Sequence, residues 1–130
     1  MMLLELKNHQ VWQNLNEILE NLDADTLIKE HLELSKYKVC GYWDDQNNYY
    51  EEIILPHTLE AQLISSSIGV TNKKRFLQMR FSLTHSNNNL DDNTFLGELL
   101  LIYNENLEFI DENWYLDIES PFIEKPNLKS

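Results

Sequence analysis

The sequence predicts an α+β domain in which helices pack on one face of an antiparallel, curved β-sheet. Three observations lead to this fold class. Apolar residues recur at helical spacing early in the chain, they alternate with polar residues at strand spacing later, and polar clusters with proline or glycine separate the segments. The predicted order is α-α-β-β-α-β-β-β. Because several strands follow one another directly, we expect neighbouring strands to pair antiparallel.

Two helices are predicted first. The segment 9–22 has an apolar stripe at helical spacing, flanked by asparagine and glutamate. The stripe consists of Val11, Leu15, Ile18, Leu19 and Leu22. Asp23 or Asp25 can supply the N-cap of a second, shorter helix. This second helix carries Leu27, Ile28, His31 and Leu32.

A β-hairpin and a third helix are expected next. Segments 37–43 and 49–55 are rich in aromatic and β-branched residues, and the polar run 44–48 between them predicts the hairpin connection. In this reading Cys40, in the first strand, is a small core residue. Pro56 ends the second strand. The following helix, 58–69, would be capped by Thr58, would place Leu59, Leu63 and Ile64 on one face, and would end at Gly69.

Three longer strands complete the predicted sheet. Segment 75–85 alternates apolar and polar residues, which is typical of a strand with one wet face. After a polar loop at 86–94, segment 95–103 is almost entirely apolar and is expected to be covered on both faces. A tight turn at 104–106 leads into a final strand at 107–118. The predicted core includes Leu15, Ile18, Leu22, Leu77, Met79, Phe81, Leu83, Leu99 and Leu101.

The domain is assigned to residues 1–120. Residues 121–130 are expected to form an extended or loose C-terminal tail, because Pro121 and Pro126 cannot join a central strand. One cysteine, no apolar span of membrane length and no signal-peptide core indicate a cytoplasmic protein without a membrane segment.

No motif for catalysis or cofactor binding is present. The four histidines lack metal-ligand spacing, and three glycines at 41, 69 and 97 cannot build a phosphate-binding loop. Cys40 lies in a predicted strand, without the neighbours that would activate a thiol. We therefore expect no catalytic residues, no metal and no cofactor.

Charge is the strongest compositional feature. With 22 acidic and 10 basic residues, the net charge is −12, which disfavours direct binding to nucleic acid or anionic membranes. Residues 81–130 contain ten acids and two lysines, whereas 41–80 are nearly balanced. A basic island is formed by Lys73, Lys74, Arg75 and Arg80. We interpret it as the solvent face of a strand, paired with neighbouring carboxylates.

Aromatic residues beside acids mark the expected partner-binding surface, because Trp and Tyr are enriched in protein interfaces. This surface is placed on the wet side of the last strands and the adjoining hairpin loop. Its predicted members are Trp43, Asp44, Asp45, Glu105, Glu108, Asp111, Glu112, Tyr115 and Asp117.

In element order the chain resembles the curved-sheet cone of the nuclear transport factor superfamily. In size, acidity and lack of motifs it resembles bacterial immunity proteins that neutralise polymorphic toxins, including those of contact-dependent growth inhibition systems. The second resemblance implies a cognate toxin domain as the partner, often a basic nuclease. We expect the chain itself to be a monomer or weak dimer. The first implies an alternative, a small-ligand-binding or isomerase-like protein. A third hypothesis is a nucleic-acid mimic that inhibits a nucleic-acid-binding protein.

Overall fold

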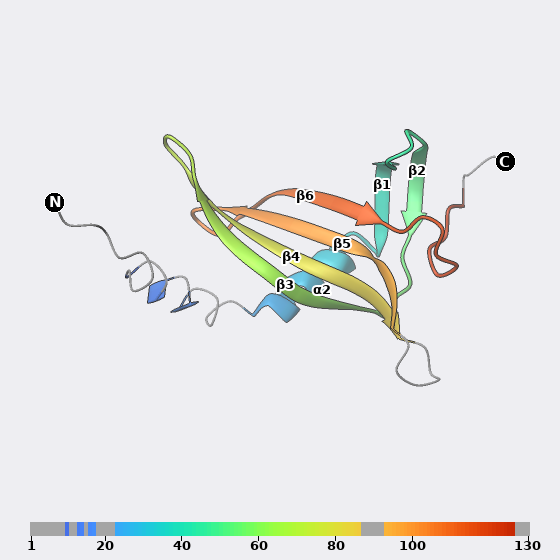
Figure 1. The fold of residues 1–130 in the computed structure, drawn as a ribbon, viewed down its shortest axis with the longest axis horizontal. Coiled ribbons are helices and arrows are strands. Elements are labelled where there is room, and N and C mark those ends of the chain that lie inside the picture. Colours follow the sequence, from blue (N-terminus) through green and yellow to red (C-terminus); the bar gives the residue numbers. More distant parts are fainter. Residues whose placement is uncertain (1–9, 11–12, 15, 18–22, 87–92, 127–130) are drawn as a thin grey trace.

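The computed structural model describes residues 10, 13–14, 16–17, 23–86 and 93–126, which form an α+β fold. Within residues 23–86 and 93–126, one helix is followed by six antiparallel strands in two sheets (Figure 1). The elements are α2 (Ala24–Leu34), β1 (Lys38–Trp43), β2 (Tyr49–Ile54), β3 (Leu59–Val70), β4 (Arg75–Ser86), β5 (Asn93–Asn104) and β6 (Phe109–Leu116). The apolar stripe of the helix predicted at 9–22, with Leu15, Ile18 and Leu22, lies outside the described residues.

Helix α2 confirms the second predicted helix. The Asp23 carboxylate caps it by accepting hydrogen bonds from the Thr26 backbone N–H at 3.1 Å and from the Thr26 hydroxyl at 2.7 Å. Its apolar stripe buries Ile28 and Leu32. The helix ends where Lys36 and Tyr37 take left-handed backbone conformations, with φ near +58° for both. This turn directs the chain into β1.

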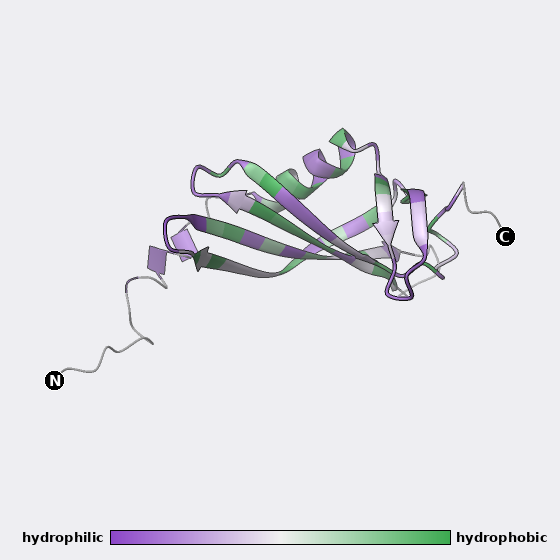
Figure 2. Ribbon diagram, turned by 90° about the horizontal axis from the view of Figure 1, so that it is seen from above, coloured by the Kyte–Doolittle hydropathy of each residue, from purple (hydrophilic) through white to green (hydrophobic). Residues whose placement is uncertain are grey.

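The larger sheet is a four-stranded meander in the order β3-β4-β5-β6. Register shifts interrupt its ladders at Leu63/Ser65, at Leu83/Thr84 and at Ile102/Tyr103. Each shift is a β-bulge, which bends the bulged strand and increases its twist. The sheet is accordingly curved, with α2 against one face (Figure 2). We call this the inner face and the opposite one the outer face.

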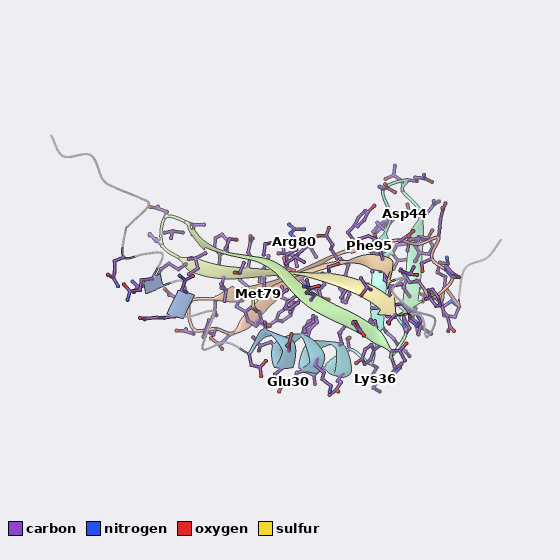
Figure 3. The ribbon with its side chains drawn as sticks, turned by 60° about the horizontal axis from the view of Figure 1, so that its bottom comes forward. Glu30, Lys36, Asp44, Met79, Arg80 and Phe95 are labelled. Carbon is purple, nitrogen blue, oxygen red and sulfur yellow. The ribbon has the colours of Figure 1, made fainter. Side chains whose placement is uncertain are left out.

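The core lies between α2 and the inner face of the sheet, where Met79 lies on the same side as the helix (Figure 3). The predicted core residues that the structure describes are all buried. They are Leu77, Met79, Phe81, Leu83, Leu99 and Leu101. Burying large apolar side chains contributes roughly 1.5–3 kcal/mol each, so this layer is the main source of stability.

The prediction of a third helix at 58–69 is wrong, because this segment is strand β3 and pairs with β4 along its whole length. The spacing of Leu59 and Leu63 fits both periods, since residues four apart share a face of a strand as well as of a helix. Ala61 lies on the same inner face between them and is also half-buried. Three serines at 65–67 already disfavour a helix.

Two burial predictions are also corrected. Strand β5 is buried on its inner face only, because Leu100 and Ile102 on the outer face are half-buried and Phe95 is exposed. In β1, Val39 is buried and Cys40 is exposed, since neighbouring residues of a strand point to opposite faces.

The two-stranded sheet β1–β2 is the predicted hairpin, with residues 44–48 as its connection. The segment after β6 returns to this hairpin. Ile54 and Glu124 form an antiparallel bridge with hydrogen bonds of 2.9 and 3.0 Å in the two directions. Ile123 is buried, so the first part of the tail expected at 121–130 packs against the domain. No helix in the described residues is long and apolar enough to cross a membrane.

Candidate partner-binding site

Asp44 organises the tip of the β1–β2 hairpin. Its carboxylate accepts hydrogen bonds from the backbone N–H groups of Gln46 at 2.9 Å and Asn48 at 2.8 Å. It also accepts from the Asn48 side-chain amide at 3.2 Å and the Tyr50 hydroxyl at 3.1 Å. The N–H of Asn48 is the main cause that lowers the pKa of Asp44. Burial and the contact with Asp44 raise the pKa of Tyr50, so its hydroxyl remains a donor at neutral pH.

Tyr42 fastens the hairpin to the end of β6. Its hydroxyl oxygen accepts a hydrogen bond of 2.9 Å from the backbone N–H of Leu116, in a buried position. The next N–H, that of Asp117, donates to the carbonyl oxygen of Leu96 at 2.8 Å. The bond to Tyr42 brings the end of β6 alongside the hairpin, and the bond to Leu96 ties the segment that follows to β5.

A polar cleft of about 330 Å³ lies between the hairpin tip and the segment that follows β6. It is lined by Tyr42, Asp44, Asp45, Gln46, Asn48, Tyr50, Tyr115, Leu116, Asp117, Ile118 and Glu119. We call it the acidic cleft, because four of these residues are carboxylic acids and none is lysine or arginine. Lys125 lies beside this lining, because its ammonium group donates a hydrogen bond to the carbonyl oxygen of Ile118.

The cleft unites four of the nine predicted site residues: Asp44, Asp45, Tyr115 and Asp117. Tyr115 is 54% exposed and belongs to the outer face of β6. Trp43 is 62% exposed and packs on Tyr49, with ring centroids 4.9 Å apart. As direct neighbours of Tyr42 and Tyr50, these two rings lie on the other face of the hairpin, outside the cleft.

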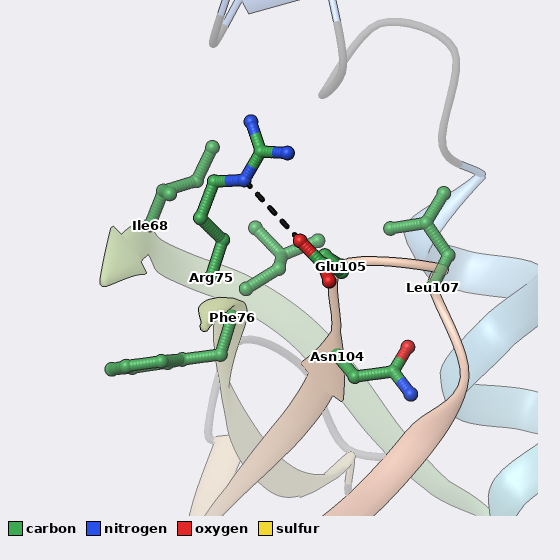
Figure 4. A pocket seen from close by; sticks show the side chains of 7 residues that line it. Ile68, Arg75, Phe76, Asn104, Glu105 and Leu107 are labelled. Carbon is green, nitrogen blue, oxygen red and sulfur yellow. Dashed lines mark hydrogen bonds and ion pairs between the residues drawn. The ribbon is translucent and has the colours of Figure 1, made fainter. Parts of the chain in front are cut away.

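Glu105 and Glu108 are not part of this cleft. They lie in the β5–β6 turn, at the end of the sheet away from the hairpin (Figure 1). Glu105 pairs with Arg75 at 3.4 Å, beside a shallow hollow of about 200 Å³ that Figure 4 shows. Glu108 closes the turn with Asn104, whose side-chain oxygen accepts the Glu108 backbone N–H at 2.9 Å.

The acids Asp111 and Glu112 point to opposite faces of β6. Asp111 is exposed and pairs in register with Ile102, on the outer face. Glu112 lies opposite Leu101 on the inner face, where it binds the ring of His31 from α2. The hydrogen bond from His31 is the main cause that lowers the pKa of Glu112. Strand alternation could have separated this pair from the sequence alone, but the partner His31 could not be deduced.

The sequence analysis missed Glu119, Gln46 and Asn48 as cleft residues. For Gln46 and Asn48 the sequence offered one indication, because aspartate followed by amide residues at 44–48 favours an Asx-type turn. Among the described residues, no group of three or more His, Cys, Asp or Glu side chains could hold a metal ion. His57 stacks on Tyr37 and His85 on Phe122, with centroids 4.4 and 4.0 Å apart, whereas His9 lies outside the described residues.

The exposed acids of the cleft suit electrostatic binding of a cationic surface. The prediction for the basic island holds in part: Arg75 and Arg80 lie on β4 and pair with Glu105 and Glu98, whereas Lys73 and Lys74 lie in the β3–β4 turn. No lysine or arginine lines the cleft. Comparison of the chain with models of protein families, with curated proteins and with solved structures finds no match.

Proposed function

We propose that this chain binds a basic protein through the acidic cleft and that the partner is a toxin domain which it neutralises, as a bacterial immunity protein does. The observation that carries this proposal is the convergence of Asp45, Asp117 and Glu119 in one cleft without lysine or arginine in its lining. Tyr115, exposed at the edge of these carboxylates, supplies the rigid aromatic contact typical of protein interfaces.

Neutralisation follows from the chemistry of such a contact. A nuclease active site is cationic because it binds phosphates, and carboxylates placed there occupy the positions of the substrate anions. Opposite net charges also steer the encounter, which raises association rates to about 10⁸ M⁻¹s⁻¹ or more at low salt. In this role the protein acts in the cytoplasm, has no catalytic residue and needs no cofactor. A nucleic-acid mimic would use the same acids against a different partner.

The small-ligand alternative has weaker support. A helix seated on the inner face of a curved sheet is consistent with a cone like that of the nuclear transport factor superfamily. However, Met79, Phe81, Leu99 and Leu101 fill this face and are fully buried. The cavity bordered by Leu27, Leu77, Met79, Tyr103 and Leu107 has a volume of only about 30 Å³. Ligand pockets usually measure about 300–1,000 Å³.

The decisive experiment is a pull-down from the native host, followed by kinetics with the captured partner. We expect a basic protein, encoded directly upstream if it is the cognate toxin. The variant Asp45→Lys/Asp117→Lys should slow association at least tenfold at low salt and flatten its salt dependence. Glu105→Lys/Glu108→Lys makes the same change in net charge at the far end of the sheet and serves as the matched control.

A partner that binds the cleft variant as fast as the wild type contradicts the proposal. So does equal slowing by the control variant, because net charge alone would then account for the effect. Expression of the partner in cells supplies a second readout, since wild-type chain should rescue growth and the cleft variant should not.

A further inference from the structure

In the part of the chain that the structure describes, strand β3 is an unprotected edge. Among the described residues it pairs with β4 only, and half the backbone polar groups of such a strand point away from its neighbour. Natural edge strands are usually blocked by charges or proline. β3 contains one charged residue, Glu60, in twelve residues and no proline, whereas β6, at the other edge, carries Asp111 and Glu112.

A groove runs beside the first residues of this edge, between α2 and β3. Its volume is about 430 Å³. The apolar part is formed by Ile28, Leu32, Tyr37, Leu59 and Ala61, and the polar part by Asp25, Lys29, His57 and Glu60. A groove between a helix and an edge strand accepts an added strand, whose backbone pairs with the edge while alternate side chains enter the groove.

The bulge in the middle of β3 determines which second strand would fit. Before it, Leu59, Ala61 and Leu63 lie on the inner face. After it the alternation is shifted by one residue, so that Ser66, Ile68 and Val70 lie on this face. Ile68 is 37% and Val70 73% exposed, although both are aliphatic.

We propose that two copies of this chain pair antiparallel through β3, about a twofold axis between Ile64 and Ser65. In this register Leu59 lies opposite Val70 of the second copy, and Ala61 lies opposite Ile68. Residues directly opposite one another across a ladder share a face, and the bulge gives both members of each pair the inner face. The exposed Ile68 and Val70 of each copy thereby reach the groove of the other, and the two sheets become continuous.

Charge complementarity favours a second copy as the occupant. The β3–β4 turn carries Lys73 and Lys74 directly beyond Val70, whereas the groove at the opposite end of the strand is bordered by two acids, Asp25 and Glu60, and by one cation, Lys29. Antiparallel pairing places the two lysines of one copy beside this groove of the other, where acids outnumber the cation, twice by symmetry. The serines at 65–67 keep the centre uncharged, so two chains with a net charge of −12 can approach there.

Sedimentation velocity of the full chain, from about 5 to 500 μM, tests the association, and two variants test the register. Gln62 lies opposite Ser67 of the second copy, on the outer face. Gln62→Lys/Ser67→Lys therefore places like charges across the interface, whereas Gln62→Lys/Ser67→Glu places opposite charges there. We expect a reversible dimer whose dissociation constant is about tenfold or more higher in the first variant than in the second. Hydrogen exchange should slow in β3 with rising concentration and remain constant in β6.

A chain that stays monomeric throughout this range overturns the proposal. Exchange protection, in the monomer, of the β3 amides that point away from β4 does so too, because another segment of the same chain would then cover the edge. Equal dimerisation of the two variants overturns the register. None of these results bears on the acidic cleft, which lies at the opposite edge of the sheet, beside β6.

Discussion

At the scale of single residues, acids of similar sequence context perform different tasks. Asp44 and Asp45 are neighbours, yet Asp44 is occupied by the hairpin turn while Asp45 faces the cleft. Asp111 and Glu112 are likewise adjacent, but Glu112 binds His31. An acid whose carboxylate accepts several hydrogen bonds within the chain stabilises the local structure, even where a partner also approaches it.

Replacement of Asp44 should weaken the hairpin and change the response to acid. The pKa of its carboxyl is lowered below 3.8 in the folded protein, so its stabilising contribution is complete above that value. This contribution is lost as the pH falls through the lowered folded pKa. Asp44→Ala should lower the melting temperature at pH 7 by a few degrees and reduce the further fall between pH 4 and 2. Scanning calorimetry of both proteins checks this, with Asp45→Ala as control.

At Gly97 the backbone of the neighbouring strand β6 leaves no room for a side chain. Its φ is +152°, and an added Cβ would lie 2.2 Å from the carbonyl oxygen of Tyr115. Gly97→Ala must therefore displace the end of β6, where Leu116 pairs with Gly97, and we expect a loss of about 2–4 kcal/mol in urea unfolding. Gly69→Ala is the comparison, because there the obstacle is the ring of Phe76, which can rotate. Equal losses would contradict this account.

At the scale of elements, the spacing of apolar residues predicted α2, the hairpin, β4 and the final strands, because in each of them this spacing fits either a helix or a strand but not both. The pattern did not predict β3, because the spacing of Leu59 and Leu63 fits both a helix and a strand. Pairing with β4 makes this segment a strand. The pattern also placed the candidate site only in part. A hydrogen bond from the backbone N–H of Leu116 to the hydroxyl of Tyr42 brings residues 44–45 close to residues 115–117. A contact between segments this far apart cannot be predicted from the local sequence pattern.

Loss of this bond should loosen the cleft without unfolding the domain. Tyr42→Phe keeps the ring but leaves the buried N–H of Leu116 without its acceptor, which costs about 1–3 kcal/mol. Hydrogen exchange should accelerate at Leu116 and in the hairpin while β4 remains protected. Tyr49→Phe, an exposed tyrosine of the same hairpin, is the control. Unchanged exchange at Leu116 would show that the bond does not fasten the hairpin.

At the scale of the whole molecule, the net charge of −12 opposes compaction. The exposed pairs Lys38–Glu52, Arg75–Glu105 and Arg80–Glu98 offset little of this repulsion, since surface ion pairs contribute about 0–1 kcal/mol each. The acids therefore persist at some cost in stability, which a partner of opposite charge would relieve.

Salt should stabilise this protein. Raising NaCl from about 20 to 200 mM shortens the screening length to below 10 Å and weakens repulsion more than it weakens the few exposed pairs. We expect the melting temperature to rise, and to rise less in Asp45→Lys/Asp117→Lys, whose net charge is smaller. A melting temperature that falls with salt in both proteins would mean that attractive pairs dominate.

The bond between Tyr42 and Leu116 also has a consequence for synthesis. The two walls of the acidic cleft are separated by 74 positions in the chain, and the Ile54–Glu124 bridge closes the hairpin from later still. A nascent chain emerges from the ribosome in order, so the hairpin can form early while its docking surface is still untranslated. The cleft can therefore be completed only after residue 116 has emerged, and a nascent chain that ends before this residue lacks one wall of the binding site.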